Sequence, residues 1–182
     1  PESLTQIENS TFSGCSGLTS ITLNDGLKTI GSEAFARCVR LTSIHIPDSV
    51  TTIDDGAFLN CSKLVECNYP VGWTSTRSDV LRDGIFEGTS LKTLEIPEGI
   101  KTIPACAFYD CDNFEYFDLP ESLTQIQRYT FSGCTGLSEM VIPAKVETIE
   151  DFAFSGCSGL TSITLNDGLK TIGSEAFARC VR

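Results

Sequence analysis

The segment FSGCSGLTSITLNDGLKTIGSEAFARCVR occupies residues Phe12–Arg40 and occurs again, without a single change, at Phe154–Arg182. The residues between the two copies are looser versions of the same pattern. Self-similarity at a fixed spacing is the signature of a repeat array, in which each unit packs mainly on its neighbours along the chain. The duplicated segment therefore predicts a solenoid.

The repeat length follows from a phenylalanine that every unit carries at the same place. Five of the seven intervals between these phenylalanines are 23 residues, and the other two are 28 and 22 residues. The phenylalanines are Phe12, Phe35, Phe58, Phe86, Phe108, Phe131, Phe154 and Phe177. We interpret residues 1–182 as a single solenoid of about eight repeats, with an irregular repeat at 70–89.

The apolar spacing within a unit predicts a strand that ends in a turn. Leu41, Ile44 and Ile46 have the L-x-x-I-x-L form, and the last two alternate as in a strand with one inward face. Either a proline such as Pro47 or the Asn-Asp-Gly of Asn24–Gly26 follows. Proline lacks the donor that a continuing strand needs and Asp-Gly allows positive φ, so both end the strand.

The rest of each unit returns to the next strand. Val50–Ile53 predicts a short extended segment on the opposite wall, and Ser32–Phe35 predicts a single helical or 3₁₀ turn. Seven complete strand motifs, stacked about 4.8 Å apart, give a parallel sheet roughly 35 Å long. We therefore predict a β-rich α/β solenoid with 23-residue repeats and a core of stacked Phe, Leu and Ile columns.

The pattern C-x-x-L-x-x-I-x-I-P-x-x-V-x-x-I-x-x-x-A-F, read from Cys38 to Phe58, resembles the BspA-like (Treponema pallidum-type) leucine-rich repeat. Near-copies of it cover essentially the whole chain. The resemblance implies a right-handed coil with a parallel concave β-sheet. It also implies a cell-surface or secreted module of the kind associated with adhesion to host proteins or to other cells.

Seven of the nine cysteines lie three residues after a repeat phenylalanine. They could form a disulfide or metal column, or a stack of buried thiols. Side chains in one column stay near the rung spacing of about 4.8 Å, whereas disulfides need Cβ atoms about 3.5–4.5 Å apart. Zinc needs four converging ligands. We interpret the column as structural thiols. Cys106, which lies outside it, is the best candidate for an exposed reactive thiol, and the alternative is an inert, partly buried cysteine.

Residues between the inward positions of the strands should line the concave face. In the middle repeats this face gathers acidic and aromatic side chains, namely Glu66, Glu95, Tyr116, Asp118 and Glu139. They predict a binding patch for a basic protein segment or a cation. The alternative is an ordinary solvated sheet face whose charges prevent nonspecific association.

The irregular repeat is a second candidate site. It carries about five extra residues before Phe86 and contains Trp73, Arg77 and Arg82 in an otherwise acidic chain. Insertions in repeat proteins are often where binding specificity lies. The alternative is a tolerated loop in which Trp73 folds back over the gap.

Several function classes are disfavoured. A net charge of −11 repels nucleic acids and anionic membranes, and no apolar run is long enough to insert into a bilayer. His45 is the only histidine, and no phosphate loop, nucleophile elbow or H-E-x-x-H is present. We predict no enzyme activity, no cofactor and no metal site, but a noncatalytic protein-interaction or adhesion module that is secreted or at the cell surface. A host or cell-surface protein is the expected partner.

Two further interpretations stay open. The chain could be a structural spacer of a larger surface protein, or an engineered array, because the 29-residue copies show no independent drift. Its ends resemble interior repeats and carry no polar cap. Bare ends of solenoids tend to stack, so a fragment of a longer array with end-to-end self-association is expected.

Overall fold

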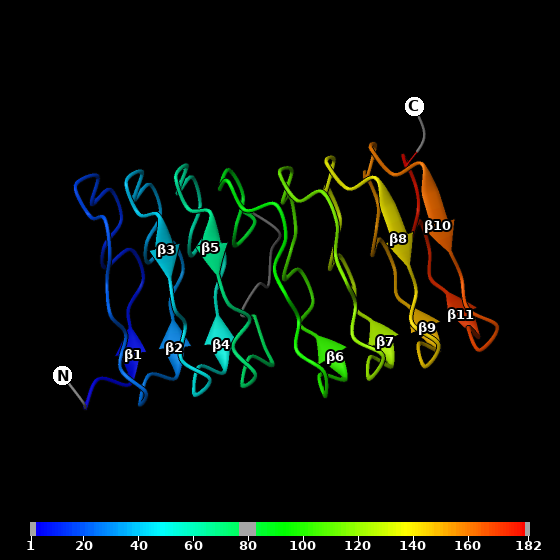
Figure 1. Ribbon diagram of the computed structural model, residues 1–182, viewed down its shortest axis with the longest axis horizontal. Helices are drawn as coiled ribbons and strands as arrows, with labels where there is room; N and C mark the ends of the chain where they lie inside the picture. The colour runs from blue at the N-terminus through cyan, green and yellow to red at the C-terminus, as the bar shows by residue number, and fades with distance from the viewer. Residues whose placement is uncertain (1–2, 77–82, 181–182) are drawn as a thin grey trace.

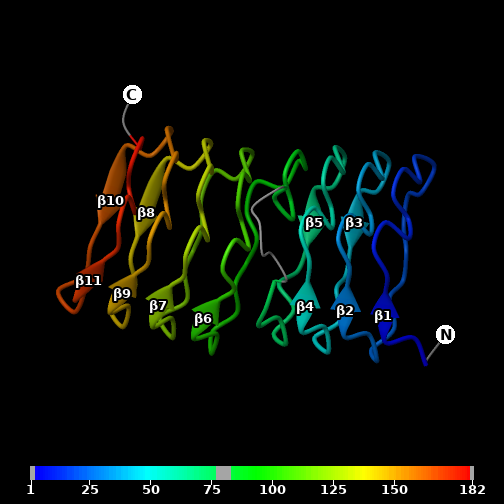
Figure 2. The same ribbon diagram turned by 180° about the vertical axis from the view of Figure 1, so that it is seen from behind.

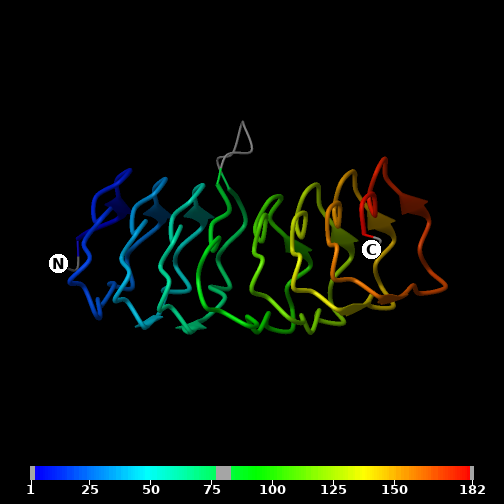
Figure 3. The same ribbon diagram turned by 90° about the horizontal axis from the view of Figure 1, so that it is seen from above.

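The computed structural model describes residues 3–76 and 83–180. Figure 1 shows the chain winding into a row of similar rungs, and Figure 2 shows the same row from behind. Each rung passes through two strand positions, which we call the first wall and the second wall. Seen from above, the row is gently curved, with the two walls on different sides of it (Figure 3). All strand pairs are parallel and join neighbouring rungs, as a solenoid requires.

The second wall holds the more continuous sheets. Its strands are β1 (Gln6–Ile7), β2 (Thr29–Ile30), β4 (Thr52–Ile53), β6 (Thr102–Ile103), β7 (Gln125–Ile126), β9 (Thr148–Ile149) and β11 (Thr171–Ile172). They form two sheets, β1-β2-β4 and β6-β7-β9-β11, in which each isoleucine pairs with the isoleucine of the next rung. This wall corresponds to the short extended segment predicted after each turn.

The first wall is the predicted leucine-rich strand, and it forms sheets in only part of the array. Within the described residues its strands are β3 (Ser43–Ile44), β5 (Glu66–Cys67), β8 (Glu139–Val141) and β10 (Ser162–Thr164). They pair as β3-β5 and β8-β10. Met140 is buried while Glu139 and Val141 are exposed, so the predicted alternation is present along β8. The continuous seven-stranded sheet expected on this wall is not formed in the described residues.

The segment around each phenylalanine is a turn, and the described residues contain no helix. Glu33 and Arg37, two residues before and after Phe35, have φ of 55° and 60°. The same left-handed backbone recurs at Ser10, Gly14, Gly56, Asn60, Gly88, Cys106, Asp110, Tyr129, Gly133, Phe152, Gly156, Glu175 and Arg179. A left-handed residue every four positions cannot continue a right-handed helix. The predicted helical turns are therefore not confirmed.

The alternating backbone of the turn lets it bond to the next rung. The bonds from one turn are Glu33 N–H to Asp55 O at 3.0 Å, Phe35 N–H to Ala57 O at 2.8 Å and Arg37 N–H to Leu59 O at 2.7 Å. The N–H groups in between donate within the turn, to the carbonyl three residues earlier. Buried backbone groups must be paired, and this arrangement pairs them without a helix.

The phenylalanines form the core column that the sequence predicts. Neighbouring rings lie with centroids 5.2–5.5 Å apart and planes within 16° of parallel, except at the irregular repeat. Such parallel rings are in offset stacking, which contributes beyond simple burial. The six rings from Phe35 to Phe154 are fully buried.

The cysteine column has a defined structural role. The thiol of Cys61 donates to the carbonyl of Phe35, one rung earlier, at 3.0 Å. The same bond joins Cys38 to Phe12, Cys134 to Phe108, Cys157 to Phe131 and Cys180 to Phe154. All nine cysteines are free. The interpretation as structural thiols therefore agrees with the structure, because a small side chain with a weak donor suits this position.

Trp73 fills the gap that the irregular repeat leaves in the core. The rings of Phe86 and Phe108 are 6.3 Å apart and inclined by 22°. The Trp73 indole lies edge-on to both, at 6.4 and 6.2 Å, and its Nε1–H donates to the carbonyl of Ser75 at 3.0 Å. Trp73 is 1% exposed, so its predicted role as a contact for a partner is corrected. The side chain folds back over the gap.

Stability should fall at alkaline pH because of the buried thiols. Burial raises the pKa of Cys61 and of Cys157 from 9.0 to about 12. Unfolding returns each thiol to water, so it releases a proton between these pH values, and the free energy of unfolding then decreases as pH rises. The expected slope is up to about 1.4 kcal/mol per pH unit for each thiol. Urea unfolding from pH 8 to 11 measures it. Cys61→Ala should make the decrease shallower, and an unchanged slope would contradict this explanation.

Tyr69 offers a second test of the core. Its ring packs on Trp73 at 5.2 Å and is 3% exposed, but its hydroxyl has no hydrogen-bond partner among the described residues. Because an unpaired buried hydroxyl destabilises the fold, Tyr69→Phe should increase the free energy of unfolding by about 1 kcal/mol. Tyr116→Phe, at an exposed position, is the control and should change it by less than about 0.5 kcal/mol. A less stable Tyr69→Phe protein would mean that the hydroxyl has a partner.

Candidate functional site

The predicted concave residues lie on the outer side of the first wall. Alternation along the rung places Tyr116 and Asp118 outward and Phe117 inward, with Tyr116 47% and Phe117 5% exposed. On the next rung Glu139 and Val141 point outward, and Val141 is 63% exposed. We call Glu95, Tyr116, Asp118, Glu139 and Val141 the acidic face.

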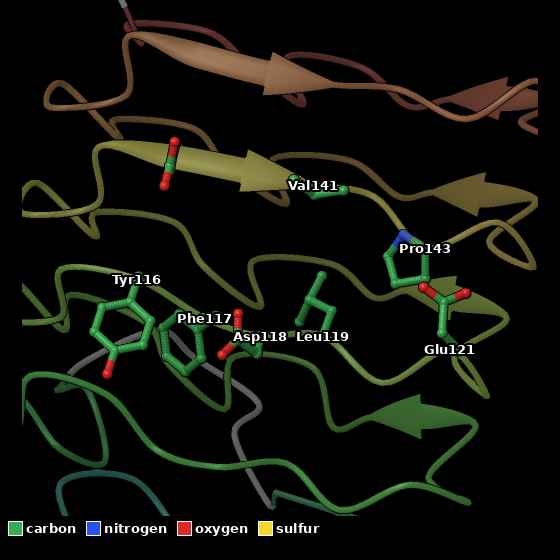
Figure 4. A pocket seen from close by; sticks show the side chains of 8 residues that line it. Tyr116, Phe117, Asp118, Leu119, Glu121, Val141 and Pro143 are labelled. Carbon is green, nitrogen blue, oxygen red and sulfur yellow. The ribbon is translucent and has the colours of Figure 1, made fainter.

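Two shallow hollows meet on this face. One, of about 290 Å³, is lined by Tyr116, Phe117, Asp118, Leu119, Glu121, Glu139, Val141 and Pro143. Figure 4 shows Tyr116–Leu119 along one rung and Val141 and Pro143 along the neighbouring rung that carries β8. The other, of about 380 Å³, is lined by Thr93, Glu95, Ile96, Glu98, Tyr116, Asp118, Leu119 and Pro120. The structure thus brings together four of the five predicted residues, around Tyr116 and Asp118.

Glu66 lies apart from these four. It belongs to β5 and lines a separate hollow with Ser20, Ser43, His45 and Asn68. The repeat pattern did not predict that Ser43 and His45 would share a hollow with a carboxylate. In the described part of the chain, no hydrogen bond joins His45 to either serine or to Glu66, and the amide of Asn68 instead bonds the backbone of Ile46.

Large core residues lie directly beneath the acidic face. Phe114 stands where the other repeats have leucine, and Phe117 stands where they have isoleucine, leucine, cysteine or methionine. The Phe117 ring lies 4.6 Å from that of Phe108, 4.7 Å from that of Phe114 and 4.9 Å from that of Phe131. The first wall carries no strand between β5 and β8 in the described residues.

The acidic face has little internal compensation of its charge. The ion pairs of the described residues are Lys92–Glu115, at 2.8 Å, and Lys170–Glu147, at 2.9 Å. No described lysine or arginine therefore pairs with Glu95, Asp118 or Glu139. Glu98 uses a carboxylate oxygen to accept the backbone N–H of Glu121 at 2.9 Å. Within the described residues, no group of three or more His, Cys, Asp or Glu side chains is placed to hold a metal ion.

The remaining sequence candidates do not form a second site. Arg77 and Arg82 lie outside the described residues. Cys106 is half-buried, and burial, with a contribution from Asp55, raises the pKa of its thiol to about 11. A thiol that stays protonated at neutral pH is a poor nucleophile, so Cys106 does not have the environment of a reactive cysteine.

The structure shows an aromatic cluster that the sequence analysis missed. Tyr129 and Phe152 stack at 4.9 Å on the turn edge, and Tyr109 lies edge-on to Tyr129 at 6.4 Å. The Arg128 guanidinium carbon is 4.9 Å from the centre of the Tyr129 ring. The sequence contains a signal for this cluster: Tyr129 and Phe152 lie two residues before a repeat phenylalanine, at a position where the other repeats carry Ser, Glu, Gly or Cys.

The chain resembles proteins of known architecture. A family model described as BspA type leucine rich repeat region, with 6 copies, matches residues 1–84 and 79–182. A leucine rich repeat protein of T. pallidum is 23% identical with a TM-score of 0.60, and the match covers 97% of this chain and 70% of that one. This likeness shows the solenoid fold.

Two further solved structures are more distant. A leucine rich cell surface protein of Faecalibacterium prausnitzii A2-165 is 21% identical with a TM-score of 0.48, over 98% of this chain and 62% of that one. The pneumococcal vaccine antigen PcpA is 20% identical with a TM-score of 0.49, over 98% of this chain and 59% of that one. No curated protein matches the chain.

Proposed function

The chain belongs to the BspA-type leucine-rich repeat family, and we propose that it is a noncatalytic module that binds another protein through the acidic face. Leucine-rich repeat families are generally noncatalytic and serve as surface or protein-interaction modules. No helix among the described residues has the length and hydropathy needed to cross a membrane. Location at the cell surface or in secretions, and adhesion to a host or cell-surface protein, are part of the same proposal and rest on the family.

The observation that carries the proposal is the surroundings of Tyr116. Its exposed ring belongs to both hollows, and exposed Val141 lines one of them. Tyrosine is enriched among the residues that dominate binding energy at interfaces, because it combines a large apolar area with a polar end. The core beneath this ring is formed by the packed aromatic side chains of Phe108, Phe114 and Phe117, which hold the backbone that carries Tyr116 in place.

The charge of the face indicates the chemistry of the partner. Glu95, Asp118 and Glu139 surround Tyr116 without a described basic residue to neutralise them. A lysine or arginine side chain can lay its alkyl stem on Tyr116 and Val141 while its charged end meets a carboxylate. A basic segment of a protein is therefore the proposed ligand, and its binding should weaken as salt concentration rises.

Substitutions that copy the duplicated repeat test this surface without disturbing the fold. Tyr116→Ser, Asp118→Thr and Glu139→Ser introduce the residues found at Ser162 and Thr164 in the same columns. Against a panel of immobilised extracellular-matrix and cell-surface proteins, Tyr116→Ser should weaken binding about tenfold or more. The two carboxylate variants should also reduce the salt dependence of binding.

Ser162→Ala, in the column of Tyr116 but outside the hollows, is the matched control and should bind like the unmodified protein. All variants should keep the free energy of unfolding within about 0.5 kcal/mol, because the positions are exposed. If a panel protein binds a variant that carries Tyr116→Ser, Asp118→Thr and Glu139→Ser together as tightly as the unmodified chain, the acidic face is not the binding surface. Absence of binding to the whole panel would favour a spacer role.

A further inference from the structure

Among the described residues, the strand pairing of the second wall is interrupted at one place. On the second wall the sheet β1-β2-β4 ends with a single bridge from Thr52 to Ser75, and the next sheet begins at β6. On the first wall the described residues form no strand pair between β5 and β8, so the unpaired stretch of that wall includes this place but extends beyond it. Figure 1 shows this gap in labelled strands between β4 and β6, and between β5 and β8.

The hydrogen bonds between turns are interrupted at the same place. Phe58 N–H donates to Ile85 O at 2.9 Å, and Phe108 N–H donates to Thr130 O at 2.9 Å. Between the turns of Phe86 and Phe108, no such backbone bond is formed by the described residues. The N–H of Gly84 is taken instead by the carboxylate of Glu87, within its own turn, at 3.0 Å.

Side chains provide most of the remaining connection. Among the described residues, backbone bonding across this place is reduced to Ser90 N–H to Leu64 O at 3.0 Å. Side-chain bonds add Thr76 Oγ1 to Ala105 O at 2.8 Å, Ser90 Oγ to Ser62 O at 2.8 Å and Asn113 Nδ2 to Thr89 O at 2.5 Å. The indole of Trp73 packs between Phe86 and Phe108.

From these contacts we infer that the chain consists of two cooperative folding units, residues 3–89 and 90–180, that meet at the Trp73 contact and can open independently. The stability of a repeat protein is approximately the sum of its unit stabilities and of the interactions between neighbours. A junction at which the described residues form none of the repeated turn-to-turn backbone bonds couples its two sides less than the other junctions do. The units then open separately, as local cooperative segments of native proteins do.

The acidic face, from Glu95 to Val141, lies wholly within the second unit. The arrangement of the acidic face should therefore persist when the first unit opens, so the second unit should keep its binding surface without the first.

Native-state hydrogen exchange in increasing urea, read by mass spectrometry on the full chain, tests the inference. The free energy of opening, plotted against urea concentration, should follow one curve for the protected amides of residues 27–75 and a different curve for those of residues 102–155. A single curve shared by both groups would overturn the division. This measurement needs no variant, so it decides the question even if a substitution fails to fold.

A matched pair of core variants sharpens the result. Phe35 and Phe131 are both fully buried and each stacks on a ring above and below. Phe35→Leu should speed exchange of the protected amides of 27–75 on the order of tenfold and leave those of 102–155 unchanged. Phe131→Leu should do the reverse. If either variant speeds both groups equally, the array is one cooperative unit and the inference is wrong.

Discussion

The hydrogen bonds between successive turns fix the position of nearly everything else in the molecule. A turn can donate three backbone N–H groups to its neighbour only if residues on both sides of the phenylalanine adopt positive φ. That backbone holds the rungs close enough for the phenylalanine rings to stack at 5.2–5.5 Å and for each cysteine thiol to reach the carbonyl one rung earlier. Core, turn and thiol positions are thus consequences of one bonding pattern.

The inward-facing residues were predictable because they recur in columns. Phe131, Cys134 and Ile149 are buried as the repeat pattern predicts, and the family resemblance extends over the whole chain. The same columns led to Glu95, Tyr116, Asp118 and Glu139, which the structure places together. Glu66 is separate because β5 lies on the other side of the interruption in the first wall.

The turns and the irregular repeat could not be predicted in the same way. Glycine is the residue that usually marks a left-handed backbone, but here Glu33, Cys106 and Tyr129 adopt it. These residue types do not distinguish this turn from a turn of helix, so the sequence predicts a helical turn instead. Trp73 falls in a segment whose length differs from every other repeat, and its burial depends on the wider spacing of Phe86 and Phe108. Neither property is visible in the periodicity, because both depend on contacts between rungs.

The direction of the bonds between turns also bears on how such a chain is assembled. The turns of Phe12, Phe35, Phe58, Phe108, Phe131 and Phe154 each donate the same three N–H groups to the rung that follows, whereas the turn of Phe86 in the irregular repeat does not do so within the described residues. Rungs of the regular length are therefore compatible with one another as neighbours, whatever their outward side chains are. The copies at 12–40 and 154–182 keep identical residues although the rungs beside them differ. Gene duplication can lengthen an array of this kind without compensating mutations, which leaves the outward positions free to diversify.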